Sequence, residues 1–198
     1  MSAIFKLSYG LFVLTAKDGD KDNGCIINTA QQVTSEPLQM SICVNKNNYT
    51  HDMIKESGQF NLSILSQDAS FDIFQRFGMQ CGKDIDKFEG FGQVERSENG
   101  LLYITKGTNA VISVKVDNMV DVGTHTMFIG KITEDKDIAD VPSATYQYYF
   151  DNIKPKPAAK KKGWVCKICG YVYEGEELPP DFICPICKHG AEAFEPIK

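Results

Sequence analysis

Four cysteines near the C-terminal end of the chain form two matched pairs, Cys166-Lys-Ile-Cys169 and Cys184-Pro-Ile-Cys187. Fourteen residues separate the two pairs. Two C-x-x-C knuckles of this kind can place four thiolates at the corners of a tetrahedron, a geometry that selects zinc or iron. The identity of the metal decides whether such a site transfers electrons or only stabilises a fold.

Other uses of the cysteines fit the sequence less well. A thioredoxin-like redox site needs one C-x-x-C pair on a helix after a strand, and the odd total of seven cysteines argues against a disulfide framework. No apolar leader with a cleavage site is seen, so we expect a reducing, cytoplasmic location. Cys25 and Cys43 lie in apolar runs and are expected to be inert core residues, whereas Cys81 is assigned no role.

The distribution of charge predicts two domains joined by a linker. Residues 153–163 contain five lysines and no acidic residue, and two prolines favour an extended chain there. They separate a large domain, residues 1–152, from a small domain, residues 164–198. The small domain is too short to bury a self-sufficient core, so a bound metal must supply part of its folding free energy.

Composition excludes several classes of function. The chain has 198 residues, of which 42% are apolar and 24% are charged, as in an ordinary globular protein. The net charge of −5 argues against a nucleic-acid partner. No apolar run is long enough to span a membrane, so no membrane association is expected.

The large domain is predicted to be mainly β. Its short apolar runs are bounded by Gly, Asp, Asn and Pro, and residues 112–116 alternate between apolar and polar, as strands do. Closely spaced strands of this kind predict a sandwich or a barrel. The predicted strands are Tyr9–Ala16, Cys25–Ala30, Leu38–Asn45, Phe60–Leu65, Leu101–Thr105, Ala110–Val116 and Thr126–Ile132.

Two helices are predicted between these strands. Thr50 is a suitable N-cap for a helix over His51–Ser57, and Gly58 is a suitable stop. Ser70 is a suitable start for a second helix over Phe71–Phe77. Three phenylalanines of that helix are spaced to lie on one face, and we expect them to be core residues rather than cofactor contacts.

The turn before the first helix has the composition of an anion site. Residues 45–50 read Asn-Lys-Asn-Asn-Tyr-Thr and connect a predicted strand to a predicted helix. Free backbone N–H groups at a helix N-terminus, the helix dipole, Lys46 and a hydroxyl group would together fit a phosphate. The alternative is an ordinary Asn-rich turn with a surface lysine.

Segments of the large domain resemble, in order, the flavin-reductase-like family of FMN-binding split barrels. Tyr9–Ala16 and Asn28–Pro37 resemble the family's opening, residues 45–50 its phosphate loop, and Thr124–Gly130 its late strand, which carries a histidine near the flavin. The resemblance covers about residues 1–150. It implies a split β-barrel with a few helices, a homodimer, and FMN at or near the subunit interface.

The resemblance also implies a set of FMN contacts. The segment of Asn28, Thr29, Ala30 and Gln31 would approach the isoalloxazine ring. Lys46, Asn47 and Thr50 would surround the phosphate, and Lys83 and His125 would be further contacts. For three of these residues a structural role is the alternative: a strand-end turn for Asn28, a half-buried polar residue for His125, and a plain surface lysine for Lys83.

The small domain resembles rubredoxin in Trp164–Tyr173 and Ile183–Cys187. Gly170 can adopt a positive φ and turn backbone N–H groups toward the sulfurs, which stabilises the reduced centre. The loop between the knuckles is short, as in the rubredoxin-like tails of rubrerythrins. Lys188 stands where glycine usually follows the fourth cysteine, which puts the hydrogen bonds of the second knuckle in question. The aromatic residues expected to pack around the site are Trp164, Tyr171, Tyr173, Phe182 and Phe194.

The pairing of the two domains favours iron over zinc. Spacing alone does not separate the metals, because a zinc ribbon has the same knuckles. A flavin takes two electrons as hydride and can release them singly, and one iron accepts one electron at a time. This order of domains is that of the high-molecular-weight rubredoxins of anaerobic bacteria.

That resemblance implies an electron-transfer chain. NAD(P)H would reduce FMN, FMN would reduce one tetrathiolate iron per chain, and the iron would pass electrons to a flavodiiron protein that removes oxygen or nitric oxide. No catalytic side chain is predicted, because hydride transfer to flavin needs none. Two alternatives stay open: a flavin-binding protein whose structural zinc ribbon docks partners, and a flavin reductase that uses free flavin as a substrate.

Overall fold

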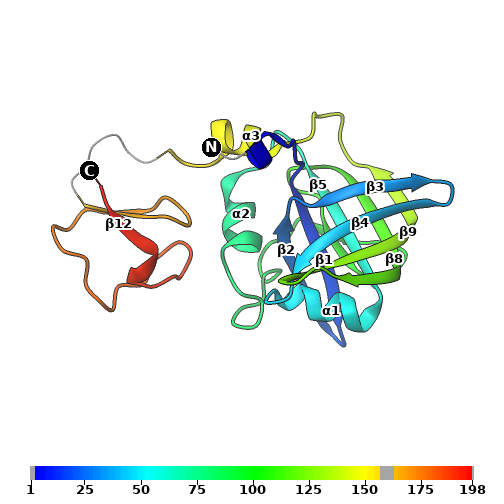
Figure 1. Ribbon diagram of the computed structural model, residues 1–198, viewed down its shortest axis with the longest axis horizontal. Helices are drawn as coiled ribbons and strands as arrows, with labels where there is room; N and C mark the ends of the chain where they lie inside the picture. Colours follow the sequence, from blue (N-terminus) through cyan, green and yellow to red (C-terminus); the bar gives the residue numbers. More distant parts are fainter. Residues whose placement is uncertain (1–2, 157–162, 198) are drawn as a thin grey trace.

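A computed structural model describes residues 3–156 and 163–197 of the chain. Figure 1 shows a β-barrel domain with a small domain beside it. Seven antiparallel strands form the large sheet in the order β2-β1-β5-β8-β9-β4-β3, which confirms the predicted mainly-β fold. The strands are β1 Phe12–Asp18, β2 Lys21–Ile27, β3 Ala30–Ser35, β4 Leu38–Asn45, β5 Gln59–Leu65, β8 Thr108–Asp121 and β9 His125–Asp137, and β6 Val94–Arg96 pairs separately with β7 Leu102–Ile104.

The connection between β2 and β3 shows that this sheet curls into a barrel. The two strands form opposite edges of the sheet, yet only Asn28 and Thr29 connect them. Such a short connection brings the ends of the two strands within about 11 Å of each other. The Thr29 hydroxyl donates to the Cys43 carbonyl at 2.7 Å, which fixes this crossing to β4. The two edges of the sheet therefore come together at Asn28 and Thr29.

The barrel encloses a continuous apolar core. Alternate residues of β1, namely Phe12, Leu14 and Ala16, point into it, as the two-residue period of a strand requires. Val114 of β8 is fully buried in the same core, with its alternate neighbours packed beside it, as the sequence pattern predicts. Burial of these side chains is the main source of the barrel's stability.

Helix α1, Tyr49–Ser57, follows β4 and packs against the barrel (Figure 1). Its buried residues Met53 and Ile54 join the core. The predicted N-cap was wrong: Asn48 caps the helix and accepts the backbone N–H of Thr50 at 3.1 Å. The predicted stop is confirmed, because Gly58 has φ 66° and donates its N–H to the carbonyl of Ile54.

Helix α2, Phe71–Gly78, lies on the side of the barrel that faces the small domain (Figure 1). Phe74 and Phe77 are buried in a second apolar cluster, as expected of core phenylalanines. The Phe74 ring packs on Tyr149 with the ring centroids 4.4 Å apart. Tyr149 belongs to a helical segment that the sequence analysis missed, made of α3 Tyr146–Tyr148 and the π-helical η2 Tyr149–Ile153. A further short helix, η1 Ala3–Lys6, lies at the N-terminal end.

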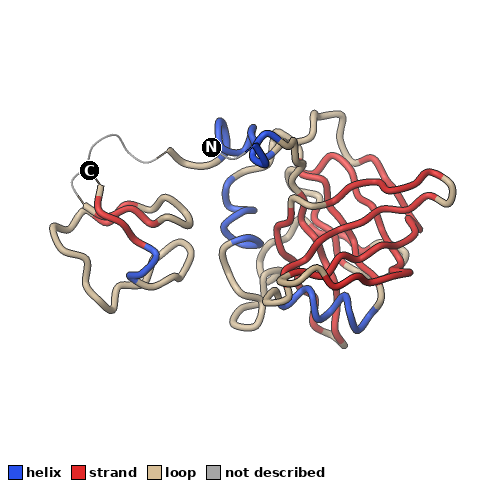
Figure 2. Tube along the Cα trace, viewed as in Figure 1, coloured by secondary structure: helices blue, strands red, loops and turns tan. Residues whose placement is uncertain are grey.

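The small domain is built around a three-stranded sheet in the order β11-β10-β12 (Figure 2). Its elements are β10 Trp164–Cys166, β11 Val172–Tyr173, the 3-10 helix η3 Ala191–Ala193 and β12 Phe194–Pro196. Residues 157–162 of the predicted linker lie outside the described residues. Among the helices that are described, none has the length and apolar character needed to cross a membrane.

Candidate functional site

The four cysteines of the two knuckles converge on one point in the small domain. All four are buried, and their sulfurs lie within 4.8 Å of one another. The Cys166 and Cys187 sulfurs are 3.6 Å apart, and those of Cys169 and Cys184 are 3.5 Å apart. A regular tetrahedron with metal–sulfur bonds of about 2.3 Å has edges of about 3.8 Å. The donor set therefore fits one tetrathiolate metal ion with little rearrangement.

The backbone of each knuckle repeats the same turn. In both, the first cysteine donates its N–H to a carbonyl five residues later and accepts an N–H from the residue after the second cysteine. The two turns are thus related by an approximate two-fold symmetry around the site. The bonds are Cys166 N–H to Tyr171 and Cys184 N–H to His189 at 2.8 Å, with Gly170 N–H to Cys166 at 2.8 Å and Lys188 N–H to Cys184 at 2.9 Å.

Backbone N–H groups also point at the sulfurs. Burial raises the pKa of the Cys187 thiol to about 11, and the N–H of His189 acts in the opposite direction. Burial also opposes ionisation of Cys184, yet the pKa of this thiol falls below its ordinary value because the N–H groups of Cys187 and Ile186 favour the thiolate. These donors stabilise negative charge on the sulfurs, and so favour a metal-bound, electron-rich centre.

The second knuckle keeps its hydrogen bonds despite Lys188. This residue has φ 61°, in the left-handed region that Gly170 occupies with φ 80° in the first knuckle. The left-handed conformation costs about 1–2 kcal/mol for a residue with a side chain. The rest of the turn imposes it, and the N–H of His189 still favours the thiolate of Cys187. The departure from glycine therefore leaves the turn intact.

The aromatic residues expected around the site do pack there. Phe194 is buried against the four cysteines, and the other four predicted aromatic residues are partly buried against the same cluster. Phe182 and Phe194 meet edge to face with centroids 5.3 Å apart. Met79, which follows α2 in the barrel domain, also packs against this cluster. The metal site is therefore in apolar contact with the large domain.

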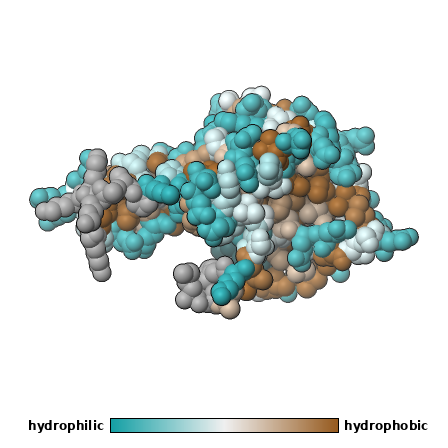
Figure 3. Space-filling model, turned by 90° about the horizontal axis from the view of Figure 1, so that it is seen from above, coloured by the Kyte–Doolittle hydropathy of each residue, from teal (hydrophilic) through white to brown (hydrophobic). Residues whose placement is uncertain are grey.

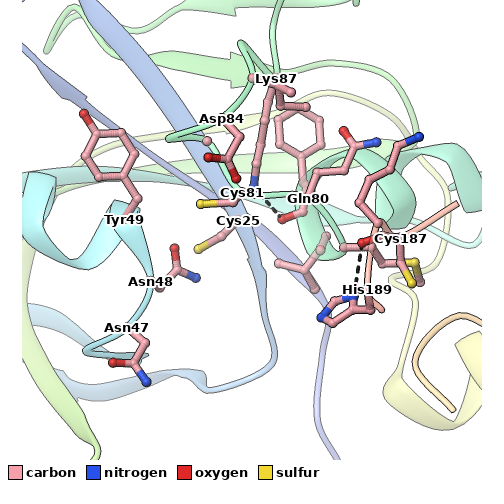
Figure 4. A pocket seen from close by; sticks show the side chains of 17 residues that line it. Cys25, Asn47, Asn48, Tyr49, Gln80, Cys81, Asp84, Lys87, Cys187 and His189 are labelled. Carbon is pink, nitrogen blue, oxygen red and sulfur yellow. Dashed lines mark hydrogen bonds between the residues drawn. The ribbon is translucent and has the colours of Figure 1, made fainter. Parts of the chain in front are cut away.

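A cavity of about 500 Å³ lies between the barrel and the second knuckle. On the barrel side it is lined by β2, by Asn47–Tyr49, and by the segment from Phe77 to Ile85. On the other side it is lined by Cys187, Lys188 and His189. In Figure 4 the His189 ring lies on the pocket side of its knuckle, whereas the Cys187 sulfur points away from the pocket. One wall of this cavity is thus made by a residue that also supplies a metal ligand.

The predicted phosphate loop lies at this cavity, with its polar groups already engaged. Lys46 Nζ lies 2.7 Å from Asp121 Oδ2, and this hydrogen bond holds the pKa of the Asp121 carboxyl below its usual range. The N–H of Asn47 donates to Asn45 Oδ1 at 2.9 Å, so the N–H groups expected to be free bind asparagine oxygens instead. Asn47 itself is exposed and lines the cavity. A phosphate would have to displace these internal partners.

Thr50 does not face the cavity. Its side chain is fully buried, and its hydroxyl accepts a hydrogen bond from the Asn23 amide at 3.0 Å. This contact ties the first turn of α1 to β2. The Thr50 hydroxyl therefore does not contact a phosphate in the cavity. Thr50 would contribute to such a site only by fixing the position of the loop.

The other predicted flavin contacts surround the same end of the barrel. Asn28 and Thr29 form the crossing from β2 to β3, and Ala30 and Gln31 begin β3. His125 begins β9 and pairs with Asn45, beside the predicted phosphate loop. Thr29 bonds to Cys43 and His125 pairs with Asn45, so both segments lie at the C-terminal end of β4.

Lys83 is exposed at the rim of the cavity. Its Nζ lies 5.5 Å from the centroid of the Tyr49 ring, close enough for a cation–π contact. Tyr49 lines the cavity, and the Gly82 and Asp84 neighbours of Lys83 line it as well. Lys83 thus joins the loop after α2 to the start of α1.

Two further residues revise the sequence analysis. Cys25 is a buried core residue, as predicted, but Cys43 is only half-buried and lies outside the core clusters. Lys87, which the sequence analysis missed, is 3% exposed and donates to the Gly24 carbonyl at 2.9 Å and to the Phe77 carbonyl at 3.2 Å. Burial lowers the pKa of Lys87. Its two hydrogen bonds join β2 to the end of α2 and so shape the cavity wall.

Comparison with known families assigns both domains. Residues 4–156 match the model of the flavin reductase like domain, and residues 164–195 match that of the rubrerythrin, rubredoxin-like domain. A protein named high molecular weight rubredoxin from Moorella thermoacetica is 34% identical, with 98% of each chain covered. A ferric-chelate reductase (NAD(P)H) from Archaeoglobus fulgidus is 36% identical over 75% of this chain and 88% of its own. Among solved structures, the flavin reductase PheA2 is 28% identical with a TM-score of 0.60, covering 72% of this chain and 88% of that one.

Proposed function

This chain belongs to the flavin reductase-like family and continues into a rubredoxin-like domain, as the high-molecular-weight rubredoxins do, and we propose that it carries electrons from NAD(P)H through bound FMN to iron. The shared cavity wall is the observation that carries the proposal. It brings Asn47–Tyr49, which belong to the segment that resembles the family's phosphate loop, and Cys187, a metal ligand, to one space. A flavin there would lie beside the metal site.

The residues of the two domains fit both iron and FMN. Cys166, Cys169, Cys184 and Cys187 would hold one iron, and the N–H groups of the knuckles would favour its reduced state. Lys46 and Asn47 would hold the FMN phosphate at the start of α1, where the helix dipole favours an anion. The backbone of Asn28–Gln31 would lie along the ring at the crossing from β2 to β3. When bound, FMN takes a hydride from NAD(P)H, which supplies two electrons for two one-electron reductions of ferric iron and leaves one proton.

Two exposed apolar surfaces support a homodimer. Val33 and Leu38 lie at the β3–β4 hairpin and are 45% and 44% exposed. Met119, Val120 and Val122 lie at the β8–β9 hairpin and are 39% to 47% exposed. Figure 3 shows apolar surface gathered over the barrel on the face it presents. Exposed apolar surface of this kind is typical of an interface, and we place the partner subunit against these two hairpins.

An electron-transfer chain of this kind needs an electron donor and an electron acceptor. NAD(P)H is the electron donor, and a flavodiiron-type protein is the acceptor that we propose for the reduced iron. The four metal-binding thiols need a reducing compartment until the metal binds, so we place the protein in the cytoplasm.

Anaerobic stopped-flow spectroscopy tests the relay. After mixing with NADH or NADPH, we expect the flavin absorption to bleach before the ferric charge-transfer absorption. Iron that is never reduced in a protein with full flavin and iron content would contradict the proposal. Metal analysis separates it from the zinc-ribbon alternative, since a zinc protein with flavin is yellow and lacks the second phase. Desalting separates it from the free-flavin alternative, because a substrate flavin would be lost.

Asp121 offers a second, independent test of the phosphate site. Its carboxylate holds Lys46 at 2.7 Å and would repel a phosphate that binds the same amine. We expect Asp121→Asn to strengthen FMN binding about two- to five-fold, measured by quenching of flavin fluorescence. Asp117→Asn is the matched control, because Asp117 is on the same strand and binds Gln39 instead of a lysine. Equal affinities in both variants would show that the phosphate does not use Lys46.

A further inference from the structure

His51, in the first turn of α1, is a buried histidine with a partner on each ring nitrogen. Its side chain is only 7% exposed. The Nδ1 atom lies 2.9 Å from Oδ1 of Asp52, and the Nε2 atom lies 2.9 Å from the Thr126 hydroxyl of β9. The ring also packs on Phe128 of β9, edge to face, with the centroids 5.6 Å apart. The orientation of the imidazole is therefore fixed on several sides.

The chemistry of the partners assigns the direction of the two hydrogen bonds. A carboxylate only accepts hydrogen bonds, so in the neutral ring Nδ1 donates to Asp52. The Nε2 atom then accepts the hydrogen of the Thr126 hydroxyl. The bond to Asp52 thus holds the ring in the tautomer that can bind Thr126.

The bond from His51 to Thr126 completes a frame around residues 45–50, the segment proposed to hold the FMN phosphate. Near the start of this segment, the N–H of Lys46 donates to the Thr124 carbonyl at 3.0 Å. Just after its end, His51 reaches Thr126, two residues further along the same segment of the barrel. Both ends of the proposed phosphate segment are therefore attached to residues 124–126.

The side chain of Lys46 is held by the same hairpin. Its Nζ lies 2.7 Å from Oδ2 of Asp121, which ends β8 just before the turn to β9. Donors bind an anion well only when they are held at the right spacing, and buried hydrogen bonds behind them set that spacing. Loss of the bond between His51 and Thr126 would free the first turn of α1 from the hairpin that holds Lys46. The donors of the helix and the amine would then no longer converge.

From this geometry, and resting on the proposed function, we propose that His51 is a positioning residue for the flavin phosphate. Through Thr126 it fixes the start of α1 relative to Lys46. It thereby sets the preference of the barrel for FMN over riboflavin, the same flavin without the phosphate.

His51→Asn and His51→Gln form a matched pair of variants that tests this role. Both remove the imidazole and its contact with Phe128, and both introduce an amide. The glutamine amide reaches about as far as Nε2 and can bond to Thr126, whereas the asparagine amide reaches only about as far as Nδ1. In the full-length protein, we expect His51→Asn to bind FMN about three- to ten-fold more weakly, the range for one lost hydrogen bond. His51→Gln should stay within about two-fold of the natural chain.

Riboflavin separates positioning of the phosphate site from damage to the fold. Titrations followed by flavin fluorescence should give both variants the riboflavin affinity of the natural chain, within about two-fold. Equal losses for FMN and riboflavin, or equal FMN affinities in the two variants, would overturn the role of His51. Thr126→Val should reproduce His51→Asn, and the two changes together should weaken FMN binding no further than either alone. Additive losses would contradict a shared hydrogen bond.

Lys46→Ala in the same titration distinguishes failure of this role from failure of the proposed function. FMN affinity that is unchanged by Lys46→Ala would contradict the proposed phosphate site itself. Weaker binding in Lys46→Ala with natural binding in His51→Asn would leave that site in place and overturn the role of His51 alone.

Discussion

Replacing Cys184 by serine is expected to remove iron from the protein and to unfold the small domain while the barrel keeps its flavin. Three thiolates and a hydroxyl bind the metal much less tightly, and metal binding to such a small domain contributes on the order of 10 kcal/mol to its folding. Iron should fall from about one per chain to a small fraction of that, with loss of the ferric charge-transfer bands. Metal analysis and visible spectroscopy give the result directly.

Cys81→Ser is the matched control for this experiment. Cys81 is exposed and lies outside the cluster of four, so its replacement should leave iron content and spectrum unchanged. Proteolysis after residue 163 should become rapid in Cys184→Ser only. Full iron content with an unchanged spectrum in Cys184→Ser would show that the metal is held elsewhere.

Replacing Lys46 by alanine is expected to weaken FMN binding by roughly ten- to a hundred-fold, the range for loss of one hydrogen bond to a charged group. The change removes the amine that would neutralise the phosphate. It also frees the carboxylate of Asp121, which then repels the phosphate. Titration with FMN, followed by flavin fluorescence, measures the effect.

Lys55→Ala controls for the change in net charge. Lys55 is exposed in the last turn of α1, at the end of the helix opposite to Lys46. Its replacement should leave FMN affinity within about two-fold, since charges at a distance on the surface are screened. If Lys46→Ala binds FMN as tightly as Lys55→Ala does, the phosphate lies at another place on the barrel.

The sequence was most informative where a strand carries buried residues. The β4 prediction, Leu38–Asn45, has the bounds of the observed strand, because four of its eight residues are buried. The third strand, Ala30–Ser35, was missed as a separate element because it is an edge strand with no buried residue. The end of β8 was misplaced for the same reason. The strand extends to Asp121, five residues beyond its predicted end at Val116, and these five residues are all exposed.

The metal site was predictable because its ligands come from two short local motifs. The cavity was not, because its walls come from β2, the start of α1, the segment after α2 and the small domain. Lys87 illustrates the difficulty: a lysine in an acidic loop gives no sign that it will be buried between two backbone carbonyls. The N-cap was also not predictable from residue type, because both Asn48 and Thr50 suit that position. In the structure it is the Asn48 side chain that accepts a helix N–H group, that of Thr50.

The symmetry of the two knuckles has a consequence for the speed of the redox step. Backbone N–H groups point at the sulfurs of Cys169, Cys184 and Cys187, and the aromatic rings packed around the cluster limit the rearrangement of solvent there. A centre of this kind changes its bond lengths and surroundings little when its charge changes by one, so its reorganisation energy is small. We therefore expect electron exchange with a bound iron to be fast whenever an electron donor or acceptor contacts this domain.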